Sequence, residues 1–210
     1  MKTLYFDLGM GAAGDMLTGA LLELMPDREA ALEQLNRLGL PHTQFSMEQG
    51  SKCGISGTHI HVTVLGQEEQ PCQDEPRHEQ EHAHDHGHSH TAMADIRQTV
   101  QALSVSDAVK ARVLEVYARI AQAESQVHGV SVSEIHFHEV GTLDALADIT
   151  AVCYLLEQLS PERIVASPVQ VGYGKIRCAH GILPVPAPAT AQILLGVPIR
   201  AGDIPGELCT

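Results

Sequence analysis

The sequence has very few aromatic residues: no tryptophan, three phenylalanines and four tyrosines among 210 residues. A core rich in aromatic side chains is therefore excluded, although a hydrophobic fraction of 44% is sufficient for a buried core. That core must consist mainly of Leu, Val, Ile and Ala. We expect an α+β fold with mixed helices and strands, built as an aliphatic-rich globular domain.

Positive charge is also scarce. Only 13 Lys and Arg residues stand against 26 Asp and Glu residues, which gives a formal net charge of −13 at pH 7 with histidine neutral. Contacts with phosphate groups of nucleic acids require clustered Lys and Arg, so we expect no nucleic acid partner. An acidic chain is instead compatible with attracting cations.

The sequence lacks cysteine motifs and long apolar runs. Its five cysteines are odd in number, scattered and never spaced as C-x-x-C, which excludes a disulfide framework and a zinc ribbon. No apolar run approaches the length of a membrane span, and Asp7 interrupts any signal-like run at the N-terminus. We therefore expect a cytoplasmic protein with no membrane partner.

Hydrophobic periodicity divides the chain into two structured parts and one polar segment. Residues 1–65 predict an α/β unit with a glycine turn, and residues 93–210 predict a second α/β unit that packs with the first as one domain. Residues 66–92 are dominated by Glu, Gln, Asp and His, which predicts a flexible loop. The expected helices are a pattern from Leu17 to Leu24 and residues 27–38, 92–103, 106–127, 142–158 and 188–195; the expected strands are residues 3–8, two strands within 44–65, and short strands from 163 to 176.

Apolar stripes predict the buried faces of the longer helices and of one strand. In residues 44–65 the two strands are joined by a turn around Gly54 to Gly57, and apolar residues of the second strand alternate with His59, His61 and Thr63. One face of that strand is therefore buried, and the other carries two histidines that are candidate metal ligands. The expected stripe of residues 106–127 consists of Val109, Val113, Val116, Ile120 and Ala123.

Six of the thirteen histidines lie in one short polar tract, residues 78–90. Imidazole binds nickel, zinc and copper, and a flexible chain can wrap such an ion without a preformed pocket. A flexible tract cannot hold catalytic geometry, so we expect metal binding here and no catalysis. The alternative is a solvated polar loop. The candidate metal ligands are His78, His82, His84, His86, His88 and His90.

The segment 136–148 concentrates imidazoles and carboxylates. If His136 and His138 lie on a strand, their side chains project from the same face, and Glu139 follows at the next turn. If a helix begins near residue 142, Asp144 and Asp148 stand one turn apart and repel each other, which a cation or a hydrogen-bonded ligand would relieve. The alternative is that Asp144 favours the helix dipole and Asp148 is solvated.

A glycine turn follows the first expected strand. Gly9, Gly11 and Gly14 precede a helix, an arrangement that resembles a phosphate-binding loop. It has no Walker-type lysine, and the carboxylates of Asp7 and Asp15 would repel a phosphate unless a metal bridged them. An ordinary tight turn is the alternative. Further along, His180 precedes a proline-stiffened segment, where a lone histidine is either a structural residue or part of a site.

Four segments together resemble the LarC nickel insertion proteins, which complete the nickel-pincer cofactor of lactate racemase. A histidine-rich insertion in the same place is also similar to that family. The segments are Asp7 to Met16, Gly54 to Val62, Phe137 to Asp148, and His180 to Thr190.

The resemblance implies a nickel chelatase, or cyclometallase. Its substrate is pyridinium-3,5-bisthiocarboxylic acid mononucleotide, into which nickel is inserted with formation of nickel–sulfur bonds and a nickel–carbon bond. The family reaction consumes CTP and is helped by Mn²⁺ or Mg²⁺. Family members generally continue past residue 210 into a C-terminal domain that handles the nucleotide, and some are made as two halves. The resemblance thus implies an N-terminal part that acts with a C-terminal half, and we expect a homo-oligomer.

Site residues are assigned on this basis. The expected catalytic residues include His138 and Glu139, acting as nickel ligands or as the base for the proton of the pyridinium carbon, and both roles stay open. A nickel store or chaperone without catalysis is the alternative function, and a nucleotide-binding protein that uses the glycine turn is a third. The catalytic set is His138, Glu139, Asp144 and Asp15; the cofactor-binding set is Asp7, Gly11, Gly14 and His180; and the metal set is the tract histidines with His59, His61, His136 and Asp148.

Overall fold

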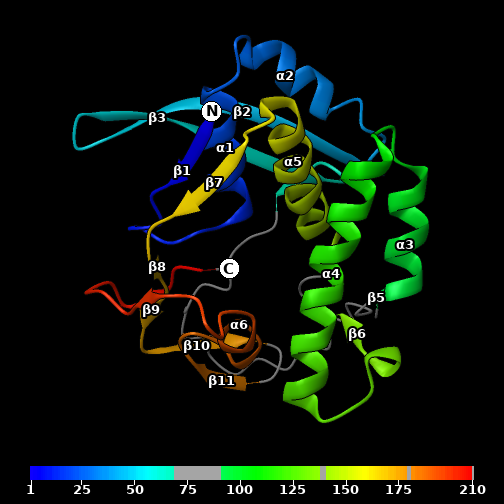
Figure 1. Cartoon of the computed structure of the whole chain (residues 1–210), viewed down its shortest axis with the longest axis vertical. Coiled ribbons are helices and arrows are strands. Elements are labelled where there is room, and N and C mark those ends of the chain that lie inside the picture. Colours follow the sequence, from blue (N-terminus) through cyan, green and yellow to red (C-terminus); the bar gives the residue numbers. More distant parts are fainter. Residues whose placement is uncertain (69–90, 138–140, 179–180, 210) are drawn as a thin grey trace, which may run out of the picture.

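The computed structural model describes residues 1–68, 91–137, 141–178 and 181–209. It has a mixed α+β fold with several small sheets, which confirms the predicted class (Figure 1). The helices are α1 (Gly14–Glu23), α2 (Arg28–Leu35), α3 (Met93–Ala102), α4 (Asp107–His128), α5 (Leu143–Leu159) and α6 (Pro188–Ile193), with a short 3-10 helix η1 (Val132–Glu134). The strands are β1 (Thr3–Phe6), β2 (Thr43–Lys52), β3 (Ile55–Val64), β4 (Gln67–Glu68), β5 (Thr91–Ala92), β6 (His136–Phe137), β7 (Arg163–Ala166), β8 (Val169–Gln170), β9 (Gly172–Tyr173), β10 (Lys175–Cys178), β11 (Gly181–Pro184), β12 (Ile199–Arg200) and β13 (Gly206–Glu207).

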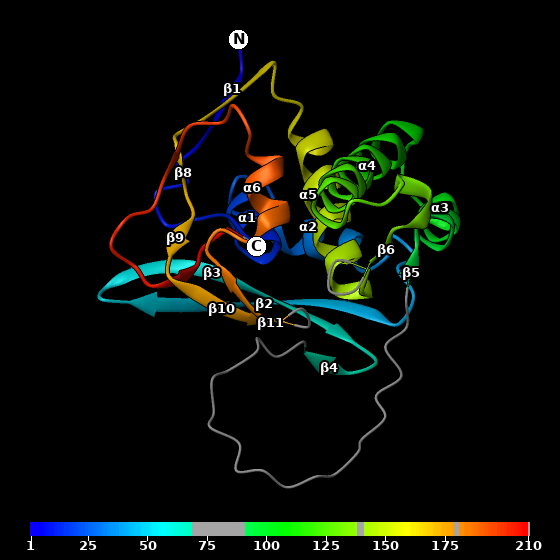
Figure 2. The same cartoon turned by 90° about the horizontal axis from the view of Figure 1, so that it is seen from below.

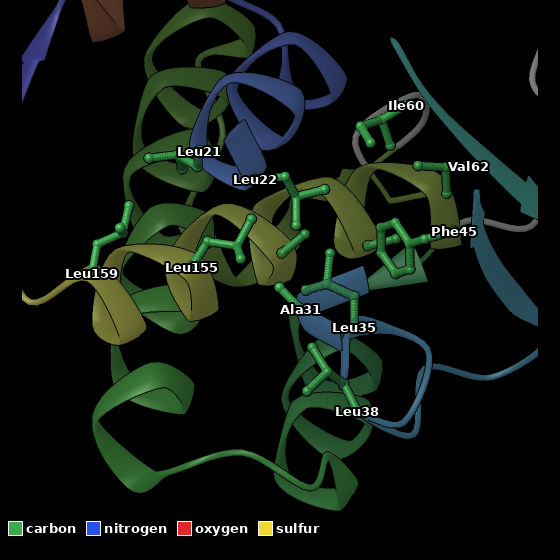
Figure 3. Close-up of a cluster of buried hydrophobic side chains, with 12 residues drawn as sticks. Leu21, Leu22, Ala31, Leu35, Leu38, Phe45, Ile60, Val62, Leu155 and Leu159 are labelled. Carbon is green, nitrogen blue, oxygen red and sulfur yellow. The ribbon is translucent and has the colours of Figure 1, made fainter. Parts of the chain in front are cut away.

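Helix α5 is shared by two hydrophobic clusters. One cluster joins α5 to α1, α2, β2 and β3, and Figure 3 shows Leu21 and Leu22 of α1 near Leu155 of α5. The other joins α5 to α3, α4 and β6, and it contains Leu146 and Cys153. Because two faces of α5 are apolar, this helix packs on one side against α1, α2, β2 and β3 and on the other against α3, α4 and β6. The α5 residues of the first cluster are Ala147, Ala151, Leu155 and Leu159, one helical turn apart.

Strands β2 and β3 form a long antiparallel hairpin, with helices on one face (Figure 2). Helix α1 approaches β3 so closely that a side chain at Gly19 would meet the carbonyl of Thr58. The turn consists of Cys53 and Gly54, both with positive φ, at 52° and 79°. This two-residue turn is tighter than the expected turn around residues 54–57, and Gly57 lies within β3 instead.

Helix α2 ends at Leu35, three residues before the predicted end. Asn36 follows the helix, and its side chain bonds with the backbone of Phe45 in β2, accepting from the N–H at 2.8 Å and donating to the carbonyl at 2.9 Å. These bonds hold the end of the helix against the hairpin. Asn36 caps the helix, so Gly39 is not its stop signal as predicted; Gly39 lies beyond the helix end with a φ of +85°.

Several short strands pair with segments that are distant in the sequence. Strand β1 runs parallel to β7, β8 runs parallel to β12, and β9 is antiparallel to β13. The β1–β7 pair and the packing of α1 on α5 connect the two predicted units, whereas the other two pairs lie within residues 93–210. The boundaries of the predicted units remain predictions, because most of the intervening segment lies outside the described residues. In the described parts of the chain, no helix combines the length and apolar character that a membrane crossing requires.

Candidate functional site

Two histidines and a glutamate lie together on the open face of the β2–β3 hairpin. Glu48 Oε1 is 3.4 Å from His61 Nε2 and 3.6 Å from His59 Nδ1. The two imidazole rings stand edge to face, with centroids 4.3 Å apart. One ligand atom from each of the three residues lies within 4.8 Å of the other two, which is close enough for binding to a single ion.

The tight hairpin turn produces this grouping. Because the turn has two residues, Lys52 faces Ile55, and each step back along β2 is matched by a step forward along β3. Glu48 therefore faces His59 across the hairpin, while His61 lies two residues further on the same face of β3. The predicted pairing of His59 and His61 on one face is confirmed, since Ile60 is buried on the other.

A second carboxylate fixes the orientation of His61. Glu68 of β4 lies opposite Thr63, and its Oε1 is 2.8 Å from His61 Nδ1. This hydrogen bond and the nearby Glu48 raise the pKa of His61 above its ordinary value, although partial burial opposes the effect. In the neutral imidazole, a proton on Nδ1 donated to Glu68 leaves the lone pair on Nε2, the ring nitrogen that lies 3.4 Å from Glu48. That is the tautomer which a metal ligand requires.

The predicted glycine turn is present, and the C-terminal segment covers it. Ala12 donates its N–H to the carbonyl of Leu208 at 2.8 Å, and Leu208 donates to Val171 at 3.2 Å. Gly11 has a φ of +98°, and a side chain there would overlap the backbone carbonyl of Leu208. A glycine at position 11 is thus explained by packing as well as by a ligand, and its predicted role in cofactor binding stays a prediction.

Helix α1 begins at Gly14, where it meets the side chain of Asp148 from α5. A side chain on Gly14 would overlap both the Cβ and the carboxylate of Asp148. The structure thus brings together the glycine turn and the second aspartate of the 136–148 segment. Gly14 and Asp148 are 134 residues apart in the sequence. An aspartate at the N-terminus of a helix is favoured by the helix dipole, and Asp15 stands in the same first turn.

An arginine that the sequence patterns do not predict also contacts the glycine turn. Arg200 of β12 donates from Nη2 to the carbonyl of Gly9 at 3.2 Å. Asp7, an exposed residue, accepts the N–H of Gly9 at 3.0 Å. A cation and a carboxylate therefore flank the same glycine, which partly offsets the negative charge of the turn.

The start of α5 matches the predicted one. Thr142 caps the helix, and its side chain accepts the N–H of Ala145 at 3.3 Å. Asp144 lies in the first turn, and Asp148 lies one turn later on the same side. His136 is exposed on β6, whereas the adjacent Phe137 is buried, as expected for alternation along a strand.

Comparison with known proteins identifies the family. The sequence profile of the nickel insertion proteins matches residues 4–210. A relative from Clostridium kluyveri, the pyridinium-3,5-bisthiocarboxylic acid mononucleotide nickel insertion protein, is 41% identical over all of this chain and 51% of its own length. Proteins of the same name from Desulfitobacterium hafniense and Geobacillus kaustophilus are 38% and 37% identical, over all of this chain and 47% and 49% of their own lengths.

The chain belongs to the nickel insertion protein family. It spans about half the length of these curated relatives and corresponds to their N-terminal half. No solved structure matches this chain. The resemblance to the LarC proteins predicted from four sequence segments is thus confirmed.

Several predicted site residues of this nickel insertion family member lie outside the described residues, so their roles remain predictions. Among the described residues, Glu48 and Glu68 join the predicted His59 and His61, and Arg200 joins the glycine turn. A turn placed at Cys53-Gly54 would have indicated Glu48, because two-residue turns are the commonest hairpin connections. The residues outside the described ranges are the tract histidines His78, His82, His84, His86, His88 and His90, and also His138, Glu139 and His180.

Proposed function

We propose that this chain is the N-terminal part of an enzyme that inserts nickel into pyridinium-3,5-bisthiocarboxylic acid mononucleotide. The observation that carries the proposal is the 41% identity, over the whole chain, with a relative that bears this name. The described cluster of Glu48, His59 and His61 supports nickel handling independently, because imidazole and carboxylate are suitable ligands for this ion.

The proposed reaction requires a proton acceptor. Nickel is a substrate, bound by the two thiocarboxylate sulfurs and by the pyridinium carbon between them. The carbon–nickel bond replaces a carbon–hydrogen bond, so one proton leaves for each ion inserted. A histidine or a carboxylate within hydrogen-bond reach of that carbon is suited to accept it. We assign this proton transfer, or nickel ligation, to His138 and Glu139.

The contact between Gly14 and Asp148 supports a single site built from the glycine turn and the start of α5. Asp148 contacts the N-terminus of α1, and Asp144 precedes it by one turn. In our proposal Asp144, Asp15 and Asp148 position the metal, with His136 as a further ligand. Asp7, Gly11, Gly14 and His180 then contact the mononucleotide.

The finer features of the activity are also part of the proposal. The enzyme is a cyclometallase that consumes CTP with Mn²⁺ or Mg²⁺, through a C-terminal half like that of the longer relatives. That half corresponds to the part of the relatives that this chain leaves unmatched. Homo-oligomer formation and a cytoplasmic location complete the expected properties.

The test is an insertion assay with the chain alone and with the C-terminal half of a relative. Nickel, CTP and the thiolated pyridinium mononucleotide are incubated with the protein, and mass spectrometry measures the nickel adduct. We expect His138→Ala, Glu139→Gln and Asp144→Asn each to lower adduct formation by at least about 100-fold, because each removes a charge or a proton acceptor at the reacting centre. Bulk nickel binding should change little, since the tract still holds metal.

A matched control is Asp107→Asn. Asp107 stands in the first turn of α4, as Asp144 stands in the first turn of α5, but it is exposed and belongs to no predicted site. Its adduct formation should equal that of the unmodified chain. Adduct formation at the normal rate by all three cluster variants would show that the cluster is structural.

The second candidate function is a nickel store or chaperone. The histidine-rich tract favours it, because six imidazoles in thirteen residues bind metal without an active site. The same assay separates the two functions: a store binds nickel in every mixture and yields no adduct, even when the C-terminal half is present.

A further inference from the structure

Distances distinguish the roles of the two glutamates beside His61. A hydrogen bond between an imidazole and a carboxylate is typically about 2.7–2.9 Å long, and the bond from His61 to Glu68 has this length, 2.8 Å. Glu48 is farther away, at 3.4 Å from His61 and 3.6 Å from His59. Two ligands bound at about 2.1 Å to one tetrahedral ion lie about 3.4 Å apart. Glu48 is therefore spaced as a fellow ligand of both histidines.

Glu68 is a hydrogen-bond partner of the kind that orients a metal-binding histidine. Such a histidine usually donates its second ring N–H to a carboxylate or a carbonyl, which fixes the tautomer and the ring orientation. His61 makes this contact through Nδ1, and its Nε2 is the atom nearest Glu48. The cluster thus has both a ligand set and an orienting partner.

The backbone beneath the cluster is anchored. Ile60 and Val62, which alternate with the two histidines, are 2% and 6% exposed and belong to the core formed with α1 and α5. Ten residue pairs connect β2 and β3, from Thr43 with Val64 to Lys52 with Ile55. Ligands on a paired, half-buried strand keep their spacing better than ligands on a loop.

We propose that Glu48, His59 and His61 form a binding site for one divalent transition-metal ion, oriented by Glu68 through His61. Two imidazoles and a carboxylate suit Ni²⁺, Zn²⁺ and Cu²⁺ and disfavour Mg²⁺ and Ca²⁺, which prefer oxygen ligands. The side chains of Glu48 and His59 are 64% and 53% exposed, so three protein ligands leave positions open to water or to a second donor. The site therefore suits an ion that is exchanged rather than a buried structural ion.

Metal binding at this site can be tested apart from the insertion reaction. It involves neither the glycine turn nor the 136–148 segment, and its metal affinity is measurable without nucleotide, pyridinium substrate or a C-terminal half. A negative insertion assay would not contradict the binding site, and a lack of metal binding at the site would not contradict the insertion proposal.

The test uses the full chain in which the six tract histidines are replaced by alanine. Isothermal titration with Ni²⁺ at pH 7.5 gives the number of sites and their affinity, and Co²⁺ absorption in the visible range reports the coordination. We expect one of the bound equivalents to belong to this site, and His59→Ala and His61→Ala should each weaken it by at least about 10-fold, with a weaker Co²⁺ band. Glu48→Gln should also lower affinity, and Glu68→Gln should do so by about 10- to 100-fold, as loss of an orienting partner does.

A matched control is available on α4, where His128 Nε2 lies 3.3 Å from Glu124. Among the described residues, this pair belongs to no group of three metal-ligating side chains. His128→Ala should leave the affinity unchanged. Low concentrations of paramagnetic Ni²⁺ should selectively broaden the NMR signals of β2 and β3. The variants of Glu48, His59, His61 and Glu68 should keep the unmodified thermal midpoint without metal, because these side chains lie on the side of the hairpin away from the core. Equal Ni²⁺ affinity with and without His59 and His61, or signal broadening elsewhere only, would overturn the proposal.

Discussion

Tyr117 places a hydroxyl group in the core between α4 and α5. Its side chain is fully buried, and its ring meets that of Phe137 edge to face, with centroids 5.6 Å apart. Among the residues that the structure describes, the hydroxyl has no hydrogen-bond partner. Burial of an unsatisfied hydroxyl costs about 1–3 kcal/mol. We therefore expect Tyr117→Phe to raise the free energy of unfolding by about 1 kcal/mol at pH 7, measured by urea denaturation.

The same burial predicts a dependence on alkaline pH. Burial raises the pKa of Tyr117 above its ordinary value of about 10, so the unfolded chain loses this proton at lower pH than the folded one. The contribution of Tyr117 to stability is therefore intact below pH 10 and is lost as the pH rises above it. Burial also raises the pKa of Cys153 to about 11, which acts in the same direction. Tyr117→Phe should lose less stability between pH 9 and 11 than the unmodified chain, whereas Tyr5→Phe, at an exposed position, should not. Equal losses in the Tyr117 variant and the unmodified chain would refute this explanation.

Single residues of the candidate metal site differ in how far the sequence predicts them. His59 and His61 follow from the alternation of polar and apolar residues in β3, a local property. Glu48 depends on the hairpin register, and a turn placed one or two residues too late leaves no basis for pairing it with His59. Glu68 belongs to a two-residue strand at the start of the polar segment, where no periodicity marks a strand.

Among the elements, the bounds of the long helices are predictable, whereas the short strands are predictable only as a group and without their partners. Helices α3, α4 and α5 lie close to their predicted bounds, because several turns of periodic sequence define each. The predicted stripe of α4 is displaced in part: Val116 and Ile120 are half-buried, while Tyr117 and Ala121 are buried. The short strands predicted from 163 to 176 are present, but β8 and β9 have two residues each and pair with segments 30 or more residues away, so no local pattern indicates their partners.

The junction of α1 with α5 gives a prediction at the scale of elements. A methyl group at position 14 would overlap the Asp148 side chain, so Gly14→Ala should lower the free energy of unfolding by about 1–3 kcal/mol. The intrinsic preference of helices for alanine over glycine, at most about 1 kcal/mol, is too small to compensate. Urea denaturation measures the change.

The control for Gly14→Ala is Gly57→Ala. Gly57 lies in β3, its φ is not positive, and a methyl group there meets nothing within 4 Å. We expect its stability to equal that of the unmodified chain within about 0.5 kcal/mol. If both variants are equally stable, α1 and α5 separate without cost, and Gly14 is not a packing requirement.

For the whole molecule, physical patterns and family membership explain different things. The formal charge of −13 and the clustered imidazoles indicate cation binding, and the hairpin geometry shows where three ligands converge. Neither identifies nickel or a pyridinium substrate, because borderline metals share the same ligands. Those chemical names come from the relatives, and for this chain they are proposals.

Nickel retention by the whole chain should depend on pH. An imidazole must be neutral to bind a metal, and its ordinary pKa is about 6.5, so protons displace nickel as the pH falls from about 7.5 to 5.5. We expect the nickel content after gel filtration to fall several-fold over this range, with the greater part of the loss due to the six histidines of residues 78–90. The chain with these histidines replaced by alanine should start at a much lower content and lose less of it. Retention that stays constant from pH 7.5 to 5.5 would instead assign the nickel to carboxylates, which are already deprotonated throughout this range.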